Sequence, residues 1–210
     1  MYTLYYWPGY CSLAAHIVLN WTGADYVLVK TDEKTRRSQS FLMMNPSGTV
    51  PVLKADFPGK KWTLSQNIAI LFCLAQEFPE AGLLGDPSSR GEISVLRWLG
   101  YINSDVHKTF TPLLHPERIP GTADVKAEVK SKALQTLVHH LGILNDAMGK
   151  NRWLVNNRRS VADPYLLVIL RWSKMLDVKL TDYPSLDRFY KHMGRDDSVT
   201  AALRQESTEL

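Results

Sequence analysis

The stretch YYWPGYCSLAAHIVLNWTG, residues 5–23, predicts a strand that turns sharply into a helix. Aromatic and β-branched residues at positions 2–6 suit a strand, which Pro8 and Gly9 then interrupt. Beyond the turn, apolar residues recur at the spacing of one helix face, and Gly23 closes the helix. These apolar residues are Leu13, Ala14, Ile17, Val18 and Trp21. A strand followed at once by a helix indicates a mixed α/β domain.

Cys11 lies at this turn, one residue before Ser12, which we expect to cap the helix. The unpaired N–H groups and positive dipole at a helix start favour a thiolate over a thiol, so this position predicts a reactive cysteine. An isolated cysteine is otherwise more often a small buried apolar residue. The other cysteine, Cys73, falls on an apolar helix pattern and is assigned to the core.

Length and composition set the class of protein. The chain has 210 residues, of which 45% are apolar, enough for one large or two small domains. It begins without the basic and apolar segments of a signal peptide and has no apolar run near the ~18 residues of a membrane span. Two cysteines do not make a secreted disulfide framework. We therefore expect a cytoplasmic protein with no membrane partner.

The formal net charge of +4 and the pI of about 9.0 raise the question of nucleic-acid binding. The basic residues form only small scattered groups and accompany no recognisable nucleic-acid-binding motif. We therefore expect solvated surface charge and no nucleic-acid partner. Adjacent helical residues such as His139 and His140 point in different directions, and no set of residues has metal-ligand spacing, so no metal site is predicted.

The chain divides into two parts with different periodicity. Residues 1–79 alternate strand and helix patterns in the order βαβ–αββα, which predicts a small mixed sheet with packed helices. Residues 80–87, EAGLLGDP, are rich in breakers and are assigned to a linker. Residues 88–210 have no strand pattern and are expected to form an all-α domain. The main helices of this domain are predicted over 93–110, 125–148 and 160–176, with shorter ones after Pro184 and Ser198.

Each long helix of the second part is predicted to bury one apolar face. The inward residues are expected to be Ile93, Leu96, Leu99, Ile102, Val106 and Phe110 on the first helix, and Leu134, Leu137, Leu141 and Leu144 on the second. At the start of the third, Ser160 and Asp163 have the spacing of a capping box, in which the acidic side chain bonds the N–H of the capping residue. We assign this pair to folding.

Two further motifs lie in the first part. The segment NPSGTVP, residues 45–51, places Val50-Pro51 at a strand start, where a cis bond would leave the backbone of Val50 free to pair with an extended peptide. The segment LSQNIAIL, residues 64–71, places Gln66 and Asn67 at a helix start, where N–H groups attract a carboxylate.

The order and spacing of Cys11, Val50-Pro51 and Gln66-Asn67 resemble the cytosolic glutathione transferases, most closely the bacterial beta class. The likeness continues through VHKTFTPL, residues 106–113, and ADPY, residues 162–165, and so spans nearly the whole chain. It implies a thioredoxin-like first domain, a helical second domain and a homodimer. It also implies glutathione bound in the first domain and small hydrophobic electrophiles bound between the domains.

The resemblance also implies roles for single residues. Cys11 matches the cysteine that faces the glutathione sulfur, His107 a histidine near that sulfur, and Tyr6 a nearby tyrosine that is not essential in this class. The remaining glutathione-binding residues it implies are Arg36 near the glycyl carboxylate, Thr49, Val50 and Pro51 along the cysteinyl unit, and Gln66 and Asn67 at the γ-glutamyl end. Trp7, Tyr10, Phe110, Leu114 and Trp172 are the candidates for the hydrophobic pocket.

Two positions depart from the family pattern. Many relatives have an acidic residue where this chain has Gln66, so no negative charge faces the glutathione ammonium group. Gly100 replaces an asparagine that in close relatives reaches the neighbouring subunit's glutathione.

Three hypotheses for the function follow. The leading one is a glutathione transferase that conjugates glutathione to small hydrophobic electrophiles. The second is glutathione-dependent thiol–disulfide exchange or peroxide reduction through Cys11. The turn holds no second cysteine, so a dithiol cycle is not expected. The third is a non-enzymatic regulator with the same fold.

Overall fold

The computed structural model describes residues 1–210, the side chain of Ser89 excepted. Its first part holds a four-stranded sheet in the order β2-β1-β3-β4. The strands are β1 (Tyr2–Tyr6), β2 (Tyr26–Lys30), β3 (Val52–Phe57) and β4 (Lys60–Ser65). β1 pairs parallel with β2 and antiparallel with β3, and β3 pairs antiparallel with β4. The mixed sheet predicted from the sequence is confirmed.

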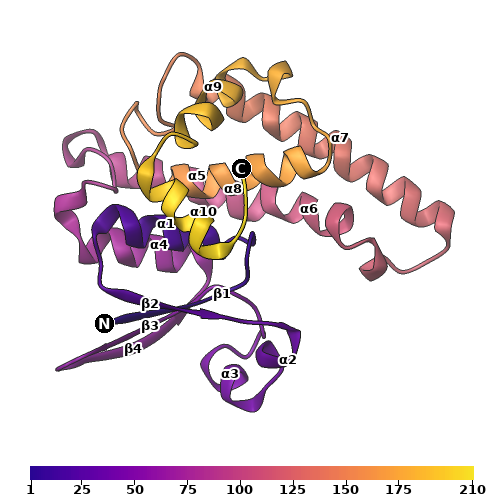
Figure 1. Cartoon of the computed structure of the whole chain (residues 1–210). Helices are drawn as coiled ribbons and strands as arrows, with labels where there is room; N and C mark the ends of the chain where they lie inside the picture. Colours follow the sequence, from indigo (N-terminus) through magenta and orange to yellow (C-terminus); the bar gives the residue numbers. More distant parts are fainter.

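Helices cover both faces of this sheet (Figure 1). α1 (Ser12–Thr22) and α4 (Asn67–Glu77) lie between the sheet and the helical part of the chain, and α2 (Glu33–Arg36) and α3 (Gln39–Met44) lie on the other side. The alternation of β1 fits this arrangement, because Tyr2, Leu4 and Tyr6 join the large core on the α1 side. Tyr5 faces the opposite way and packs against Phe41 of α3.

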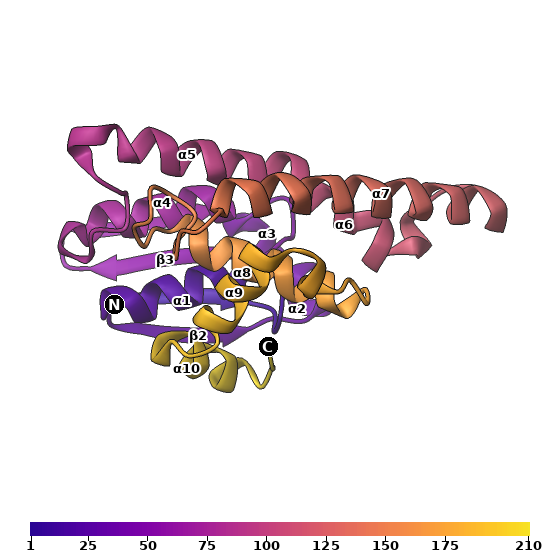
Figure 2. The ribbon, with the colours of Figure 1, turned by 90° about the horizontal axis from the view of Figure 1, so that it is seen from above.

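The second part is entirely helical. Its helices are α5 (Gly91–Tyr101), α6 (His107–Leu114), α7 (Ala123–Met148), α8 (Ala162–Met175), α9 (Pro184–Met193) and α10 (Asp197–Glu206). α8 runs through the centre, and its residues 162–173 are all buried. α1 packs against α4, α8 and α10, which joins the two parts. α7 extends away from the rest of the molecule at its N-terminal end (Figure 2).

The helix predicted over 93–110 is two helices joined by a wider π-helical turn at Ile102–Val106. Pro112, expected beyond its end, lies inside α6. The apolar face predicted for it is partly wrong, because Ile93 and Leu96 are 63% and 37% exposed. The buried stripe of α5 runs instead through Val95, Trp98 and Leu99, so the two exposed residues lie on the other side of the helix.

Leu134 of α7 is 40% exposed and was also wrongly predicted to face inward, whereas Leu137, Leu141 and Leu144 are buried as predicted. In the helical turn that holds Leu134, Ala133 is the residue that packs against the core, so the inward face of α7 runs through Ala133 and Leu137, and Leu134 lies at its edge.

The ends of two helices can be compared with their predictions. Gly23 closes α1 in the left-handed conformation, with φ of 65°, as expected. Ser12 does not cap this helix. Its Oγ donates to the Trp7 carbonyl at 3.2 Å and accepts from the Trp7 N–H at 3.3 Å, so it fixes the turn before the helix.

Half of the capping box predicted before α8 is confirmed, the bond from Ser160 to Asp163. The other half differs, because the Ser160 Oγ accepts the N–H of Ala162 at 3.3 Å and the helix begins after Val161. The Asp163 carboxylate accepts the N–H of Ser160 at 2.7 Å and, from outside the helix, the N–H of Leu154 at 2.9 Å. The side chain is fully buried, so these donors hold the loop before α8 to the central helix. Within the described residues, no helix is long and apolar enough to cross a membrane. No cluster of three potential metal ligands occurs among them either.

Candidate functional site

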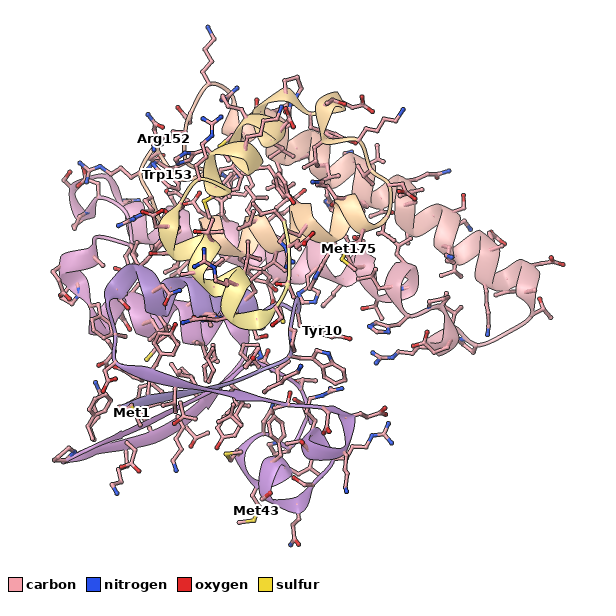
Figure 3. The ribbon with its side chains drawn as sticks, viewed as in Figure 1. Met1, Tyr10, Met43, Arg152, Trp153 and Met175 are labelled. Atoms are coloured by element: carbon pink, nitrogen blue, oxygen red, sulfur yellow. The ribbon has the colours of Figure 1, made fainter. Side chains whose placement is uncertain are left out.

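A cavity of about 690 Å³ lies where the two parts of the chain meet. Its walls come from the turn after β1, from α6, from α8 and from the residues that follow α10. Figure 3 labels Tyr10 and Met175, which lie on two of these walls. Of the predicted pocket residues, four line it: Tyr10, Phe110, Leu114 and Trp172. Trp7 packs instead on the α3 side of the sheet, under the guanidinium of Arg36.

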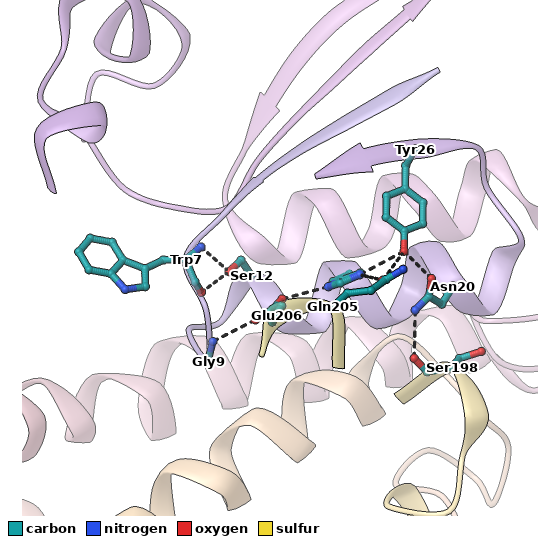
Figure 4. A network of polar contacts seen from close by, with 9 residues as sticks. Trp7, Gly9, Ser12, Asn20, Tyr26, Ser198, Gln205 and Glu206 are labelled. Atoms are coloured by element: carbon teal, nitrogen blue, oxygen red, sulfur yellow. Dashed lines mark hydrogen bonds and ion pairs between the residues drawn. The ribbon is translucent and has the colours of Figure 1, made fainter. Parts of the chain in front are cut away.

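The turn that carries Cys11 is held from the helical part of the chain. The Trp172 indole N–H donates to the Gly9 carbonyl at 2.9 Å, and the Gly9 N–H donates to Oε2 of Glu206 at 3.0 Å (Figure 4). The other carboxylate oxygen, Oε1, lies 3.0 Å from Nδ1 of His16 on α1. Gly9 has φ of 75°, a conformation that favours glycine. α8 and α10 therefore fix the position of the cysteine.

Cys11 lines the cavity, but its thiol is buried and is not in the thiolate form that its place at a helix start was expected to favour. Its Sγ donates to the Val50 carbonyl at 3.6 Å. Burial raises the pKa of Cys11 to about 12, although the backbone N–H groups of Cys11 and Ser12 act in the opposite direction. Desolvation is the larger effect, so the resting thiol is protonated and serves as a donor. The Val50-Pro51 bond is cis as expected, but the Val50 carbonyl is not free, because it accepts this thiol.

His107 lies on another wall of the same cavity, at the start of α6. Its ring packs edge-on to Trp172, with ring centroids 4.8 Å apart, and its Nδ1 lies 2.7 Å from the Tyr165 hydroxyl. Burial lowers the pKa of His107 to about 4, so the imidazole is neutral at neutral pH. A neutral imidazole has one donor nitrogen and one acceptor nitrogen.

The hydrogen bonds of Tyr165 decide which nitrogen of His107 carries the proton. The Tyr165 hydroxyl donates its single proton to Oδ1 of Asn103 at 2.9 Å. It must therefore accept from His107, which places the histidine proton on Nδ1. The lone pair is then on Nε2. Both His107 and Cys11 line the same cavity. His107 has an unprotonated Nε2 that can accept a proton, and Cys11 has a protonated thiol that can donate a hydrogen bond.

The start of α4 adds an unsatisfied polar group close to this pair. The Asn67 side chain is buried next to the Tyr165 hydroxyl, and its amide oxygen accepts no hydrogen bond. Gln66 is exposed and holds the left-handed φ of 75° without being glycine. Unsatisfied buried groups and backbone strain both concentrate at ligand-binding sites.

A second cavity, of about 330 Å³, lies on the α3 side of the molecule. Arg36 and Thr49 line it, as does Arg118 from the helical part of the chain. The Arg36 guanidinium stacks on Trp7 at 4.3 Å and donates to the Gly48 carbonyl at 3.1 Å, while its Nε is buried without a partner. This basic cavity suits a carboxylate.

Neither cavity is described as lined by four of the predicted site residues, Val50, Pro51, Gln66 and Asn67. Tyr6 also lies elsewhere. Its side chain is buried against α1, with its ring centroid 6.3 Å from that of His16, and it is not among the residues described as lining either cavity. Sequence reasoning in turn missed Tyr165 as a partner of His107, and Asn103 and Arg118 altogether. Tyr165 belongs to the ADPY motif, but nothing in the sequence indicates that its hydroxyl meets a histidine 58 residues away.

Comparison with known proteins gives consistent matches over the whole chain. Residues 1–76 match the family model of the glutathione S-transferase N-terminal domain, and residues 101–197 match that of the C-terminal domain. A glutathione S-transferase, GST-4.5, of Xanthomonas campestris pv. campestris is 38% identical, and the match covers 97% of this chain and 98% of that protein.

Two solved structures extend the comparison to the fold. A sphingomonad glutathione S-transferase complexed with glutathione has a TM-score of 0.85 and 35% identity, with 99% of this chain and 100% of that one covered. A bacterial beta class glutathione S-transferase of Sphingomonas chungbukensis also has a TM-score of 0.85 and 35% identity, with the same coverage.

Proposed function

The chain belongs to the glutathione S-transferase family and is a glutathione transferase, and we propose that it joins the glutathione thiol to small hydrophobic electrophiles in the cavity of about 690 Å³. The observation that carries the proposal is that two residues line one cavity, a neutral His107 with an unprotonated Nε2 and Cys11 with its thiol. Residues 1–79 form the glutathione-binding domain, residues 80–87 the linker and residues 88–210 the helical domain of the electrophile pocket.

Glutathione binds along the first domain in this proposal. The backbone of Val50, next to Pro51, pairs with the cysteinyl unit, and Gln66 and Asn67 hold the γ-glutamyl end. The buried amide oxygen of Asn67 supports this placement, because it accepts no hydrogen bond in the structure and a bound ligand would supply one.

The glycyl carboxylate of glutathione goes to the basic cavity of Arg36 and Thr49. The buried, unpartnered Nε of Arg36 supports this, since a carboxylate matches a guanidinium donor better than water does.

The reaction needs the glutathione thiol as a thiolate, and the free thiol, with a pKa of about 8.5, is mostly protonated at neutral pH. Nε2 of His107 accepts the thiol proton. The Cys11 S–H, which donates to the Val50 carbonyl in the structure, turns to donate a hydrogen bond to the glutathione sulfur and leaves that carbonyl free to pair with glutathione. The thiolate then forms a bond to carbon of the electrophile, and the leaving group departs with the electron pair of the broken bond. The negative sulfur beside the imidazolium raises the pKa of His107 above its resting value of about 4, and once the sulfur has bonded to carbon the histidine releases the proton to solvent.

The raised pKa of Cys11 also bears on the alternative of disulfide exchange. Thiolate is the nucleophile in such exchange, and burial raises the pKa of Cys11 to about 12. The thiolate is then a very minor form of Cys11 at pH 7. We therefore propose a hydrogen-bonding role for Cys11, and no role in the chemistry for Tyr6, which lies beside His16.

The assembly and location remain proposals as well. We propose a homodimer in which the exposed apolar residues of α5, Ile93 and Leu96, are covered by the second subunit. We propose a cytoplasmic location, in keeping with Cys11 and Cys73 both being free thiols.

The test is the rate at which purified protein joins glutathione to 1-chloro-2,4-dinitrobenzene, with glutathione binding measured separately by calorimetry. We expect saturable binding and a rate above that of the uncatalysed reaction. If the protein shows no glutathione binding and no acceleration of the reaction, the proposal is overturned. Mass spectrometry after treatment with glutathione disulfide checks the alternative, and we expect no glutathione adduct on Cys11.

A further inference from the structure

Arg171 is a buried cation in the wall of the cavity. It lies on α8 next to Trp172, lines the cavity and is only 8% exposed. Removing a guanidinium from water is costly unless charge or several hydrogen bonds compensate for it. What surrounds Arg171 therefore needs an explanation.

The partners of Arg171 in the structure are neutral. Its Nε donates at 2.9 Å to the backbone carbonyl of Glu209, and its Nη2 donates to the same oxygen. In the part of the chain that the structure describes, no carboxylate forms an ion pair with Arg171. The Glu206 carboxylate attracts it at longer range, but the oxygens of Glu206 bond to His16 and Gly9. The guanidinium thus retains the capacity to bind an anion.

The other walls show what kind of anion fits. Tyr10, Phe110, Leu114, Trp172 and Met175 give the cavity a mainly apolar and aromatic surface. His107, which also lines this cavity, is neutral at neutral pH. A ligand that matches this cavity has an apolar body, an electrophilic carbon for the glutathione sulfur and a negative group for Arg171.

The segment that holds Arg171 is the end of the chain, residues 207–210. It follows α10, and its first three residues line the cavity. The hydroxyl of Thr208 is buried there without a partner, so the segment is not fully satisfied in this position. Its Glu209 carbonyl gives Arg171 two hydrogen bonds but no charge, and a carboxylate would give both.

We propose that Arg171 is the anion-binding residue of the electrophile pocket, and that the preferred substrates are apolar electrophiles that carry a carboxylate. This rests on the transferase function proposed above. In the reaction the glutathione sulfur forms a bond to the electrophilic carbon, the leaving group departs as an anion, and the thiol proton passes through His107 to solvent. Arg171 takes no part in these bonds and acts only on the distant carboxylate.

The experiment uses two electrophiles that differ only in charge, 4-chloro-3,5-dinitrobenzoate and 4-chloro-3,5-dinitrobenzamide. Thiolate displaces chloride from the same carbon in both, and each kcat/KM is divided by the uncatalysed rate constant. We expect the unmodified protein to favour the carboxylate about tenfold, the effect of one charge-assisted hydrogen bond. Arg171→Met should abolish that preference, and Arg171→Lys, which keeps the charge, should keep part of it.

A variant that ends at Ser207 is the control for the tail. Without Glu209 as competitor for Arg171, this variant should favour the carboxylate at least as strongly as the full chain. A purely structural Arg171 would alter both rates together and leave their ratio unchanged, and that result would overturn the proposal. An unmodified protein without preference for the carboxylate would overturn it too, whether or not the Arg171 variants fold.

Failure of the transferase function is a separate outcome. If neither electrophile reacts faster than without protein, quenching of tryptophan fluorescence by the unreactive 3,5-dinitrobenzoate and 3,5-dinitrobenzamide still measures the preference. Tighter binding of the carboxylate would then support Arg171 while the proposed function failed, and equal binding would contradict both.

Discussion

Two histidines of this protein, the buried His16 and the half-buried His107, have neighbours that give them different properties. His16 is fully buried, and both of its ring nitrogens are occupied, Nδ1 by Glu206 at 3.0 Å and Nε2 by Gln205 at 2.7 Å. His107 has one nitrogen on the Tyr165 hydroxyl and lines a cavity. His16 therefore joins α1 to α10, whereas Nε2 of His107 has no partner among the described residues and can take part in the reaction. The number of occupied nitrogens and the exposure of the ring both separate the two roles.

The largest expected effect is on stability, in the His16 network. Glu206→Leu should lower the free energy of unfolding by roughly 3–5 kcal/mol, because it leaves the buried His16 and the Gly9 N–H without their partner. Urea unfolding followed by circular dichroism measures it. The matched control is Glu128→Leu, which breaks an exposed ion pair with Lys132 and should cost less than about 1 kcal/mol.

Equal losses in these two variants would contradict the structural role of Glu206. Replacing both His16 and Glu206 by leucine tests whether the loss comes from leaving one member of the buried pair without its partner. The double variant should recover part of the loss, because it buries no unpaired polar group of the pair.

The next effect is on the reaction, in the His107 network. His107→Gln should lower kcat/KM about 100-fold, since the variant lacks the base that accepts the thiol proton. Rates with 1-chloro-2,4-dinitrobenzene measure it, and His139→Gln on α7, outside both described cavities, is the control. A loss below about threefold in His107→Gln would show that the solvent, and not this histidine, takes the proton.

A smaller loss is expected from the residue behind His107. Tyr165→Phe should lower kcat/KM about tenfold, because His107 keeps its place against Trp172 but loses the bond that holds its proton on Nδ1. Nitrogen NMR of protein with ¹⁵N-labelled histidine reads the proton position directly, with Nδ1 protonated in the unmodified protein.

Asn103→Leu provides a test that is independent of rate. Without the Asn103 acceptor, the Tyr165 hydroxyl is free to donate to Nδ1, so part of the His107 protons should move to Nε2. A proton on Nε2 in the unmodified protein would contradict the whole assignment.

The contrast between these networks also explains how far the sequence could be read. The strands, α1, α4 and the bond from Ser160 to Asp163 follow from local periodicity and from pairs a few residues apart, and they were predicted. The thiolate form expected for Cys11 is not the one that its surroundings favour, because the helix start is visible in the sequence but the burial that raises the pKa of Cys11 to about 12 comes from distant elements.

The partners of the two histidines could not be predicted for the same reason. Glu206 lies 190 residues from His16, and Tyr165 lies 58 residues from His107. Only packing of the helical domain on the sheet domain brings them together. The family resemblance indicated His107 and Cys11 as candidates, but it did not indicate that His107 is neutral or that the Cys11 thiol is protonated.

The smallest effect near neutral pH is on stability, and it tests the neutral state of His107. Burial lowers the pKa of His107 from an ordinary 6.5 to about 4, so between these values the unfolded chain binds a proton that the folded chain does not. Folding is therefore weakened as the pH falls from about 6.5 to 4, by at most about 1.4 kcal/mol per pH unit. His107→Gln cannot bind this proton. As the pH falls over this range, its free energy of unfolding should therefore decrease less than that of the unmodified protein. Urea unfolding at pH 7, 6 and 5 measures the difference, and a difference that stays constant would mean that His107 titrates in the folded protein as it does in water.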